Sequence, residues 1–336
     1  MPAIARALTA AVAAAAAAVA LAQPGKPGAE APAPASRWSA QSAQMDDAMR
    51  AQWLVATGPR TDWLAGTLDT GDPAAQVTRL ASARVATPDN RLFLASLATA
   101  CLAPLRPRPA ECDATDRLAD WATRDVDNGV PSLLLADRAR QRNNPAALLA
   151  YLEEAAQRPR FDDYRNRGAL VIWEEVRALP GAYDPAARAL LAASYGALWS
   201  PFAAGAVDGL CRDGQAPTDA IRAACAAAGA AMAQRAATWS LRIAGARLAE
   251  RSAAPGPART AAGQRLADLQ RQSYECAETG NAIAAGLESA DAAARARAVA
   301  QWEARLVRDA RDGEVASCLH SAPAAALQPS VRSAAR

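Results

Sequence analysis

The 336-residue sequence predicts an all-α protein. Capping side chains stand directly before prolines, apolar residues recur at helical spacing, and the alternating β-branched and aromatic runs typical of strands are missing. Alanine supplies much of the 51% of residues that are hydrophobic, and alanine favours helix while adding little bulk to a core. Aromatic residues make up only 5% of the chain and eight of them are tryptophan, so the core should form around a few tryptophan side chains.

Residues 1–22 resemble a secretory signal peptide. Arg6 is the only charged side chain, an apolar stretch follows it, and Ala20-Leu21-Ala22 forms a small-x-small cleavage motif before Gln23. The apolar stretch is too short and too rich in alanine to favour a retained membrane anchor. We therefore expect cleavage before Gln23, a periplasmic or secreted mature chain, and no integral membrane span after cleavage.

Composition divides the rest of the chain into four segments. Residues 23–37 are rich in Pro, Ala and Gly and have no apolar period, which predicts a disordered linker. Residues 321–336 have the same character and predict a disordered tail. Between them we expect a helical-repeat region over residues 38–214 and a C-terminal helical bundle over residues 215–320.

Prolines mark where the helices of the central region begin and end. In three pairs a capping side chain precedes a proline that suits the first helical position: Asp72-Pro73, Asn144-Pro145 and Asp184-Pro185. Three other pairs should end the preceding helix: Gly58-Pro59, Thr87-Pro88 and Pro180-Gly181. The intervening helices would be about ten to twenty residues long with short connections, so neighbours in sequence should pack as antiparallel hairpins.

One four-residue turn occurs twice in this region. Residues 87–90 read Thr-Pro-Asp-Asn and residues 125–128 read Asp-Val-Asp-Asn, with the two Asp-Asn pairs 38 residues apart and each between helical segments. The pattern resembles the turn between tetratricopeptide-type repeats over about residues 60–180. The family's Trp-x-x-Leu-Gly-x-x-Tyr pattern is missing, and residues 104–112 interrupt the period. The resemblance implies a solenoid of helical hairpins that binds peptides or proteins; the alternative is an irregular bundle that uses one turn twice.

The C-terminal third predicts three long helices. The first begins near Thr218 and carries one apolar stripe: Ile221, Cys225, Ala228, Met232, Ala236, Trp239 and Ile243. After a break at residues 252–257, the second stripe follows the 3,4 spacing of a closely packed helical seam: Leu266, Leu269, Ser273, Cys276, Gly280, Ile283 and Leu287. The third helix carries Val299, Trp302 and Leu306. We expect a bundle; the alternative is that the solenoid continues with longer repeats.

The six cysteines predict structural disulfides. Sequence alone allows about fifteen pairings. Proximity favours three of them: Cys101–Cys112, Cys211–Cys225 and Cys276–Cys318. For the last pair, residues 313–317 in an extended conformation could bring Cys318 back alongside Cys276. No C-x-x-C motif is present, which argues against a redox site.

The sequence offers weak candidates for catalysis. His320 is the only histidine, close to the predicted tail, and it lacks an orienting third group. Adjacent acids occur at four places, Asp46-Asp47, Glu153-Glu154, Asp162-Asp163 and Glu174-Glu175. Neighbouring helical side chains do not face each other, so such pairs suit a solvated face better than a hydrolytic site, although Trp173 stands beside the last pair. Without metal, phosphate-loop or nucleophile-elbow motifs, we expect no catalytic residue, cofactor or metal ion.

Charge and motifs together favour a binding protein. The formal net charge is +3 and the two signs are interspersed, which argues against a nucleic-acid partner. We therefore predict an exported helical-repeat scaffold that binds a protein or peptide in the cell envelope. The alternative is a cell-wall-acting or peptide-handling enzyme whose acids converge only in the fold. A deep pocket holding an acid pair would favour the enzyme, and an apolar groove would favour the binder.

Overall fold

The computed structural model describes residues 37–68, 72–102, 109–113, 116–198, 203–212 and 218–321. Over these ranges the chain is built from helices and has two isolated β-bridges but no strand, which confirms that the fold is all-α. The predicted signal peptide, nearly all of the predicted linker and nearly all of the predicted tail lie outside the described residues.

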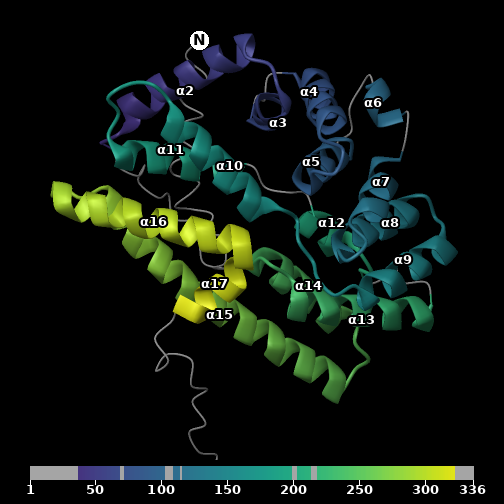
Figure 1. Cartoon of the computed structure of the whole chain (residues 1–336). Helices are drawn as coiled ribbons and strands as arrows, with labels where there is room; N and C mark the ends of the chain where they lie inside the picture. Colours follow the sequence, from purple (N-terminus) through teal and green to yellow (C-terminus); the bar gives the residue numbers. More distant parts are fainter. Residues whose placement is uncertain are drawn as a thin grey trace, which may run out of the picture.

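The first helices form a curved row that Figure 1 shows from purple to teal. Their bounds are α2 Ser39–Val55, α3 Pro59–Leu68, α4 Pro73–Ala86, α5 Arg91–Ala100, α6 Ala110–Asp113, α7 Arg117–Arg124, α8 Gly129–Gln141 and α9 Pro145–Gln157. Helices that follow one another pack together, as α3 does on α4 and α8 does on α9. Two further helices, α10 Arg165–Ala178 and α11 Pro185–Leu198, pack against each other, and α11 also contacts α2.

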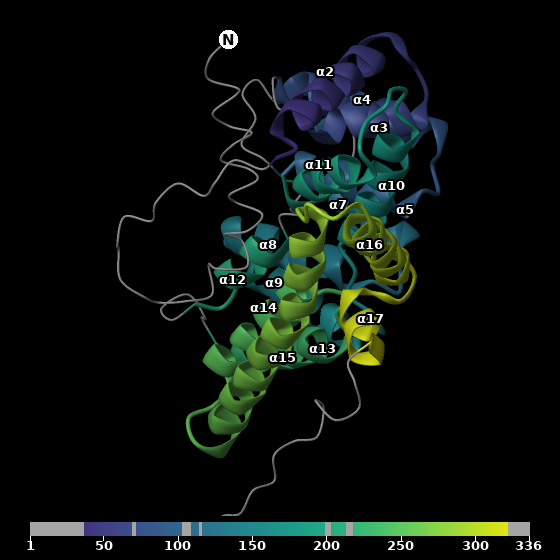
Figure 2. The same cartoon turned by 90° about the vertical axis from the view of Figure 1, so that its left-hand side faces the viewer.

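The remaining helices are α12 Ala203–Gly209, α13 Asp219–Arg235, α14 Trp239–Ser252, α15 Pro257–Leu287, α16 Ala292–Asp312 and α17 Glu314–Ser321. The 31-residue α15 lies along α14 and α16 in both Figure 1 and Figure 2. Helix α16 packs in turn on α10 and α11, and α13 packs on α9.

Several predicted boundaries are confirmed by capping geometry. Helices α4, α9 and α11 begin at the three prolines that follow a capping residue. The Asp72 carboxylate accepts a hydrogen bond from Ala74 N, and the Asn144 amide oxygen accepts one from Ala147 N. Helix α10 ends before Pro180, and α4 ends before Thr87. Local side-chain chemistry therefore sets where these helices start and stop.

The single long helix predicted from Thr218 to Ile243 is wrong. The chain breaks at residues 236–238 into α13 and α14, because Thr238 caps a new helix by accepting from Leu241 N. Ala237 is held by other segments: its N–H donates to the Phe161 carbonyl at 2.9 Å, and its carbonyl accepts from Val315 N at 3.2 Å. At Ala237, backbone hydrogen bonds to distant segments thus replace the hydrogen bonds of a continuous helix.

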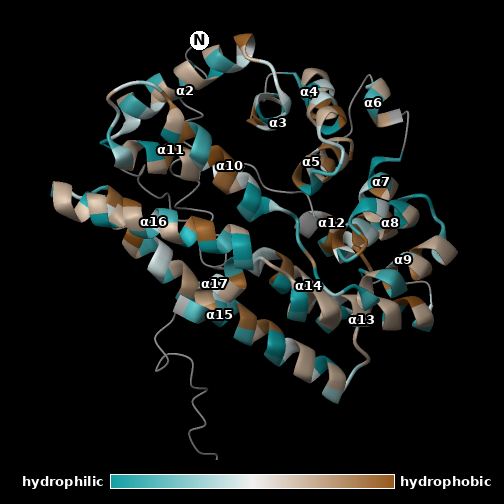
Figure 3. Cartoon of the chain, viewed as in Figure 1, coloured by the Kyte–Doolittle hydropathy of each residue, from teal (hydrophilic) through white to brown (hydrophobic). Residues whose placement is uncertain are grey.

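Tryptophan side chains mark the core along most of its length. Trp63 and Trp121 are almost completely buried, and Trp53, Trp173 and Trp239 are buried as well. The main core continues from the first described helix to α16, so it includes residues of both predicted regions. Hydrophobic and hydrophilic residues alternate around most helices in Figure 3, as expected for amphipathic helices on a shared core.

All three predicted cysteine pairs are bridged. The Cα–Cα distances are 5.4 Å for Cys101–Cys112, 6.5 Å for Cys211–Cys225 and 6.0 Å for Cys276–Cys318. The reason given for the last pair is wrong, because residues 314–321 form helix α17 and do not run extended. Gly313, with φ +88°, turns the chain between α16 and α17 and so returns Cys318 to α15.

Candidate functional site

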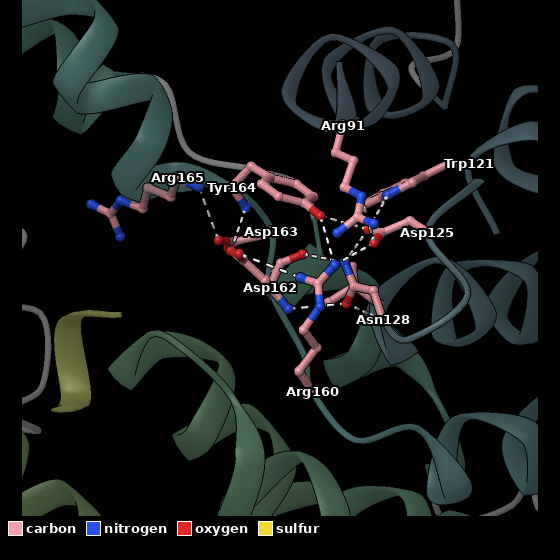
Figure 4. A network of polar contacts seen from close by, with 10 residues as sticks. Arg91, Trp121, Asp125, Asn128, Arg160, Asp162, Asp163, Tyr164 and Arg165 are labelled. Atoms are coloured by element: carbon pink, nitrogen blue, oxygen red, sulfur yellow. Dashed lines mark hydrogen bonds and ion pairs between the residues drawn. The ribbon is translucent and has the colours of Figure 1, made fainter. Parts of the chain in front are cut away.

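A buried polar network surrounds Asp125, which is 0% exposed (Figure 4). Its Oδ2 atom accepts hydrogen bonds from three side chains: Trp121 Nε1 at 3.0 Å, Asn128 Nδ2 at 2.9 Å and Tyr164 OH at 2.7 Å. Its Oδ1 atom is bound by the Arg160 guanidinium and pairs with Arg91 Nε at 3.6 Å. Both carboxylate oxygens are therefore occupied by donors of this chain.

The network joins two loops. Asn128 caps α8 through Val130 N, and its side chain also exchanges hydrogen bonds with the backbone of Asp162 at 2.7 and 3.0 Å. Gly129 N donates to the Arg160 carbonyl at 2.9 Å, and Arg160 N donates to the Asp127 carbonyl at 3.2 Å. A Cβ on Gly129 would lie 2.3 Å from the Phe161 ring, so only glycine allows this approach.

Beside this network lies a second group of acids, carried by the loop before α10 and by the start of α17. Asp163 is 4% exposed, and burial together with the neighbouring Asp162 raises its pKa to about 7. Burial also raises the pKa of Asp162 and of Glu314, whose carboxylate accepts from Trp239 N at 3.3 Å. The positive charge of Arg165 lowers the pKa of Asp163 and of Glu314, opposing the effect of burial. The backbone N–H of Arg165 donates to Asp163 Oδ1 at 3.2 Å.

The loop before α10 joins several segments of the fold. Phe161 accepts from Ala237 N, and Ala237 accepts from Val315 N, so the loop before α10 connects the α7–α8 turn to α14 and α17. The acids and arginines satisfy backbone and side-chain groups where these segments meet. Within the described ranges, no group of three or more His, Cys, Asp or Glu side chains could hold a metal ion.

The adjacent acids noted in the sequence do not face one another across a cleft. Glu174 Oε2 pairs with Arg60 Nη1 at 2.9 Å, and Glu175 Oε2 pairs with Arg60 Nε at 3.4 Å. Trp173 packs edge-on against Trp302 with ring centroids 4.7 Å apart. These residues therefore connect α10 to α3 and α16.

In two further pairs, on α2 and α9, one acid is more buried than its neighbour. Asp46 is 5% exposed and binds Arg50 and the Tyr195 hydroxyl, whereas Asp47 is exposed. Glu154 pairs with Arg158 one turn along α9, and Glu153 is exposed.

His320 lies in α17, although the sequence suggested a position where the chain loses regular structure. Its Nδ1 lies 2.6 Å from the Ala316 carbonyl of the same helix, and the ring is exposed. Cys318 is disulfide-bonded, so it offers no thiolate to pair with the imidazole.

An open trench with a volume of about 470 Å³ is formed by α13, α14 and α15. It is lined by Ala230, Ala233 and Gln234 of α13, Ala246 and Ala249 of α14, and Ala262 and Arg265 of α15. Ala233, Ala246 and Ala249 are buried and form the floor, whereas Ala230, Gln234 and Arg265 are exposed along the rim. We call this hollow the α13–α15 trench.

Small residues create the trench. Gly229 and Gly245 let α13 and α14 approach so closely that a Cβ on either would lie 2.6 Å from a backbone nitrogen of the other helix. Because the floor residues are alanines with short side chains, the space between α13, α14 and α15 stays open. Sequence reasoning noted small residues in the C-terminal helices but missed this site. The signal that could have found it is the spacing of small residues at three and four positions in both α13 and α14.

Arg265 lines one end of the trench, and Arg242 of α14 lies near it without lining the trench. Arg242 is one helical turn before Ala246, and its Nε donates to the Ala236 carbonyl at 2.9 Å, across the α13–α14 connection. Burial lowers the pKa of Arg242, and the nearby positive charge of Arg265 lowers it further. Among the described residues, neither guanidinium forms an ion pair with a carboxylate. This end of the trench is therefore basic.

None of the described helices, including the 31-residue α15, combines the length and the apolar character that a membrane span requires. The candidate functional features of the described chain are the polar network, the buried acids and the trench. Comparison with protein-family models, with curated proteins and with solved structures finds no match to this chain.

Proposed function

We propose that the chain is an exported helical scaffold that binds a peptide, or a segment of a partner protein, in the α13–α15 trench. The trench itself carries this proposal. Its volume of about 470 Å³ falls in the range of roughly 300–1,000 Å³ usual for ligand sites, and its lining is apolar with few polar groups. An apolar floor with a polar rim suits a peptide whose side chains pack and whose backbone finds hydrogen bonds at the edge.

The position of the buried acids favours a binder over the alternative enzyme. Asp163 and Glu314 lie where the loop before α10 meets α14 and α17, and neither lines the trench. A catalytic carboxyl must reach its substrate, so an acid engaged with backbone N–H groups at a junction of segments suits a structural role better.

Two recurring turns support the helical-repeat part of the proposal. Asn90 N donates to the Thr87 carbonyl at 3.1 Å, and Asn128 N donates to the Asp125 carbonyl at 2.9 Å. Each asparagine then caps the next helix through its side-chain oxygen, at 3.1 Å in both cases. The two turns thus share backbone and capping geometry, as tetratricopeptide-like repeats would. In this reading α3 to α11 form stacked hairpins, and α13 to α17 form the long-helix bundle that carries the trench.

Three disulfides support export, since such bonds persist in oxidising compartments such as the periplasm. A signal peptide at residues 1–22, cleaved before Gln23, would direct the chain there. Amino-terminal sequencing of the cellular protein tests this step, and a chain that retains Met1 would contradict it.

The binding proposal is tested with an array of short random-sequence peptides probed with the full chain. We expect a subset of peptides to bind with micromolar affinity. The Ala262→Leu variant, which fills the trench wall, should weaken binding by about tenfold or more, because the space for the peptide is lost. Ala261→Leu is the matched control, since Ala261 is exposed on the same helix and does not line the trench. Absence of binding, or equal binding by both variants, would contradict the proposal.

A further inference from the structure

The basic end of the trench is also a closed end. A second small core adjoins it and contains Ala233 and Ala246 of the trench floor together with Trp239, Leu269 and Val315. Those larger side chains fill the space between α14, α15 and α17 beyond the alanine floor. The Arg242 side chain reaches to the Ala236 carbonyl on the same side. The trench lining ends at Ala246 and Arg265 on this side, so a chain lying between the helices meets this core there.

Neither arginine at this end forms an ion pair with the nearby acids of the described chain: Asp268, one turn from Arg265 on α15, pairs with Arg271 at 2.9 Å. The closest acid on α14 in sequence to the trench floor is Glu250, which lies two helical turns beyond Arg242 and packs against α15 at Gly263. Within the described residues it forms no ion pair with Arg242 or Arg265. Other arginines of this region are already engaged: Arg259 donates to the Ala253 carbonyl and Arg251 to carbonyls near α12. Within the described residues, Arg242 and Arg265 therefore have no carboxylate ion-pair partner.

We infer that the trench binds the free C-terminal end of a peptide, with its carboxylate between Arg265 and Arg242 and small apolar side chains on the alanine floor. This inference rests on the proposed function and names its ligand. A guanidinium pairs with a carboxylate through two parallel hydrogen bonds, which orients the bound group as well as attracting it. The ligand charge would relieve the repulsion between the two arginines, which also lowers the pKa of Arg242.

The closed end favours a chain terminus over an internal acidic residue. An internal Asp or Glu requires the peptide to continue on both sides of the charged group. Here the core around Trp239 and Val315 occupies the space on one side. A C-terminal residue brings its carboxylate to the end of the chain, so it places charge at the arginines and requires no further space.

The test compares two peptide arrays that are identical except at the C-terminus, one with free carboxylates and one amidated. Both arrays are probed with the full chain and with three variants. Arg265→Gln removes the rim charge, and this side chain is exposed and makes no hydrogen bond or ion pair in the described structure, so the fold should be unaffected. Ala262→Leu fills the trench. Arg271→Gln is the matched control, because Arg271 is an exposed arginine of α15 that pairs with Asp268 and Glu275.

We expect binding to the free-carboxylate array only, weakened about tenfold or more by Arg265→Gln and unchanged by Arg271→Gln. Equal binding to both arrays that Ala262→Leu abolishes would overturn the carboxylate inference and leave the proposed function standing. Free-carboxylate binding that Arg265→Gln leaves unchanged would also overturn the inference. Failure to bind either array would overturn the proposed function and the inference together.

Discussion

The Nε1 atom of Trp38 donates a hydrogen bond of 3.1 Å to the carbonyl oxygen of Leu287, 249 residues further along the chain. Trp38 is 7% exposed, and the guanidinium groups of Arg37 and Arg295 lie 4.8 and 5.4 Å from its ring. Arg37 also donates to the Ser289 carbonyl at 2.9 Å. The first described residues thus hold the turn between α15 and α16, and connect the N-terminal helix to the C-terminal helices.

Replacement of Trp38 by alanine should lower the free energy of unfolding by about 3–5 kcal/mol, because it removes a large buried ring and leaves the Leu287 carbonyl without its donor. Trp38→Phe keeps most of the ring and should cost about 1–2 kcal/mol through the lost hydrogen bond. Urea denaturation of both variants measures the difference. An unfolding midpoint of Trp38→Ala equal to that of the wild type would show that the contact does not stabilise the fold.

Asp125→Ala should destabilise the protein by about 3–5 kcal/mol, since it leaves the Arg160 guanidinium and the Tyr164 hydroxyl without their buried acceptor. Asp127→Ala is the matched control, because Asp127 is an exposed acid of the same turn, and its effect should stay within about 0.5 kcal/mol. Thermal or urea unfolding distinguishes the two. Equal stability of the two variants would mean that the network is not the structural connection described above.

The Asp163 carboxyl should make the protein less stable as the pH rises. Its pKa is about 7 in the folded chain against an ordinary value of 3.8, because burial disfavours the charged form. Between these values the unfolded chain releases the proton and the folded chain retains it, so the free energy of unfolding falls as pH increases.

In Asp163→Asn this fall should be smaller, and at pH 8 the variant should be more stable than the wild type, by an amount on the order of 2–4 kcal/mol. The asparagine oxygen can still accept from Arg165 N, so the substitution changes the charge and little else. Urea denaturation across the window from about pH 4 to pH 8 is the measurement. Identical pH profiles for the two proteins would contradict the shifted pKa.

Loss of the Cys276–Cys318 disulfide should lower stability by about 4 kcal/mol in the chain-entropy picture, because the bond closes a loop with a sequence separation of 42. The Cys101–Cys112 bond, with a separation of 11, should contribute about 3 kcal/mol. Paired Cys→Ala variants compared by urea denaturation test the order. Peptide mapping without reduction tests the pairing itself, and a peptide linking Cys225 to Cys276 would contradict it.

Local sequence signals predicted much of the fold. A proline after a capping residue acts through adjacent atoms, so the starts of α4, α9 and α11 could be predicted. The break at residues 236–238 could not, because the apolar stripe continues through it and only contacts with Phe161 and Val315 determine the conformation of Ala237. The C-terminal segment shows the same limit, since the turn at Gly313 depends on where α17 packs.

The candidate sites were harder to predict for the same reason. Asp125 and Asn128 stood out as part of a repeated turn, but their partners Arg160 and Tyr164 come from a loop more than thirty residues away. The trench exists because alanine side chains on its floor are small. In the sequence, these alanines resemble those of any other alanine-rich helix. Such a feature has a helical spacing but no chemical motif, so the three-dimensional arrangement is needed to recognise it.

The most direct measurement is photo-crosslinking of the full chain with a free-carboxylate peptide selected from the array, carrying a photoreactive side chain near its C-terminus. Binding in the trench predicts cross-links on its lining, at residues 230–234 of α13, 246–249 of α14 and 262–265 of α15. The Ala262→Leu variant should lose these cross-links, and Ala261→Leu should keep them. Cross-links confined to helices α2 to α11, or unchanged in Ala262→Leu, would contradict the account.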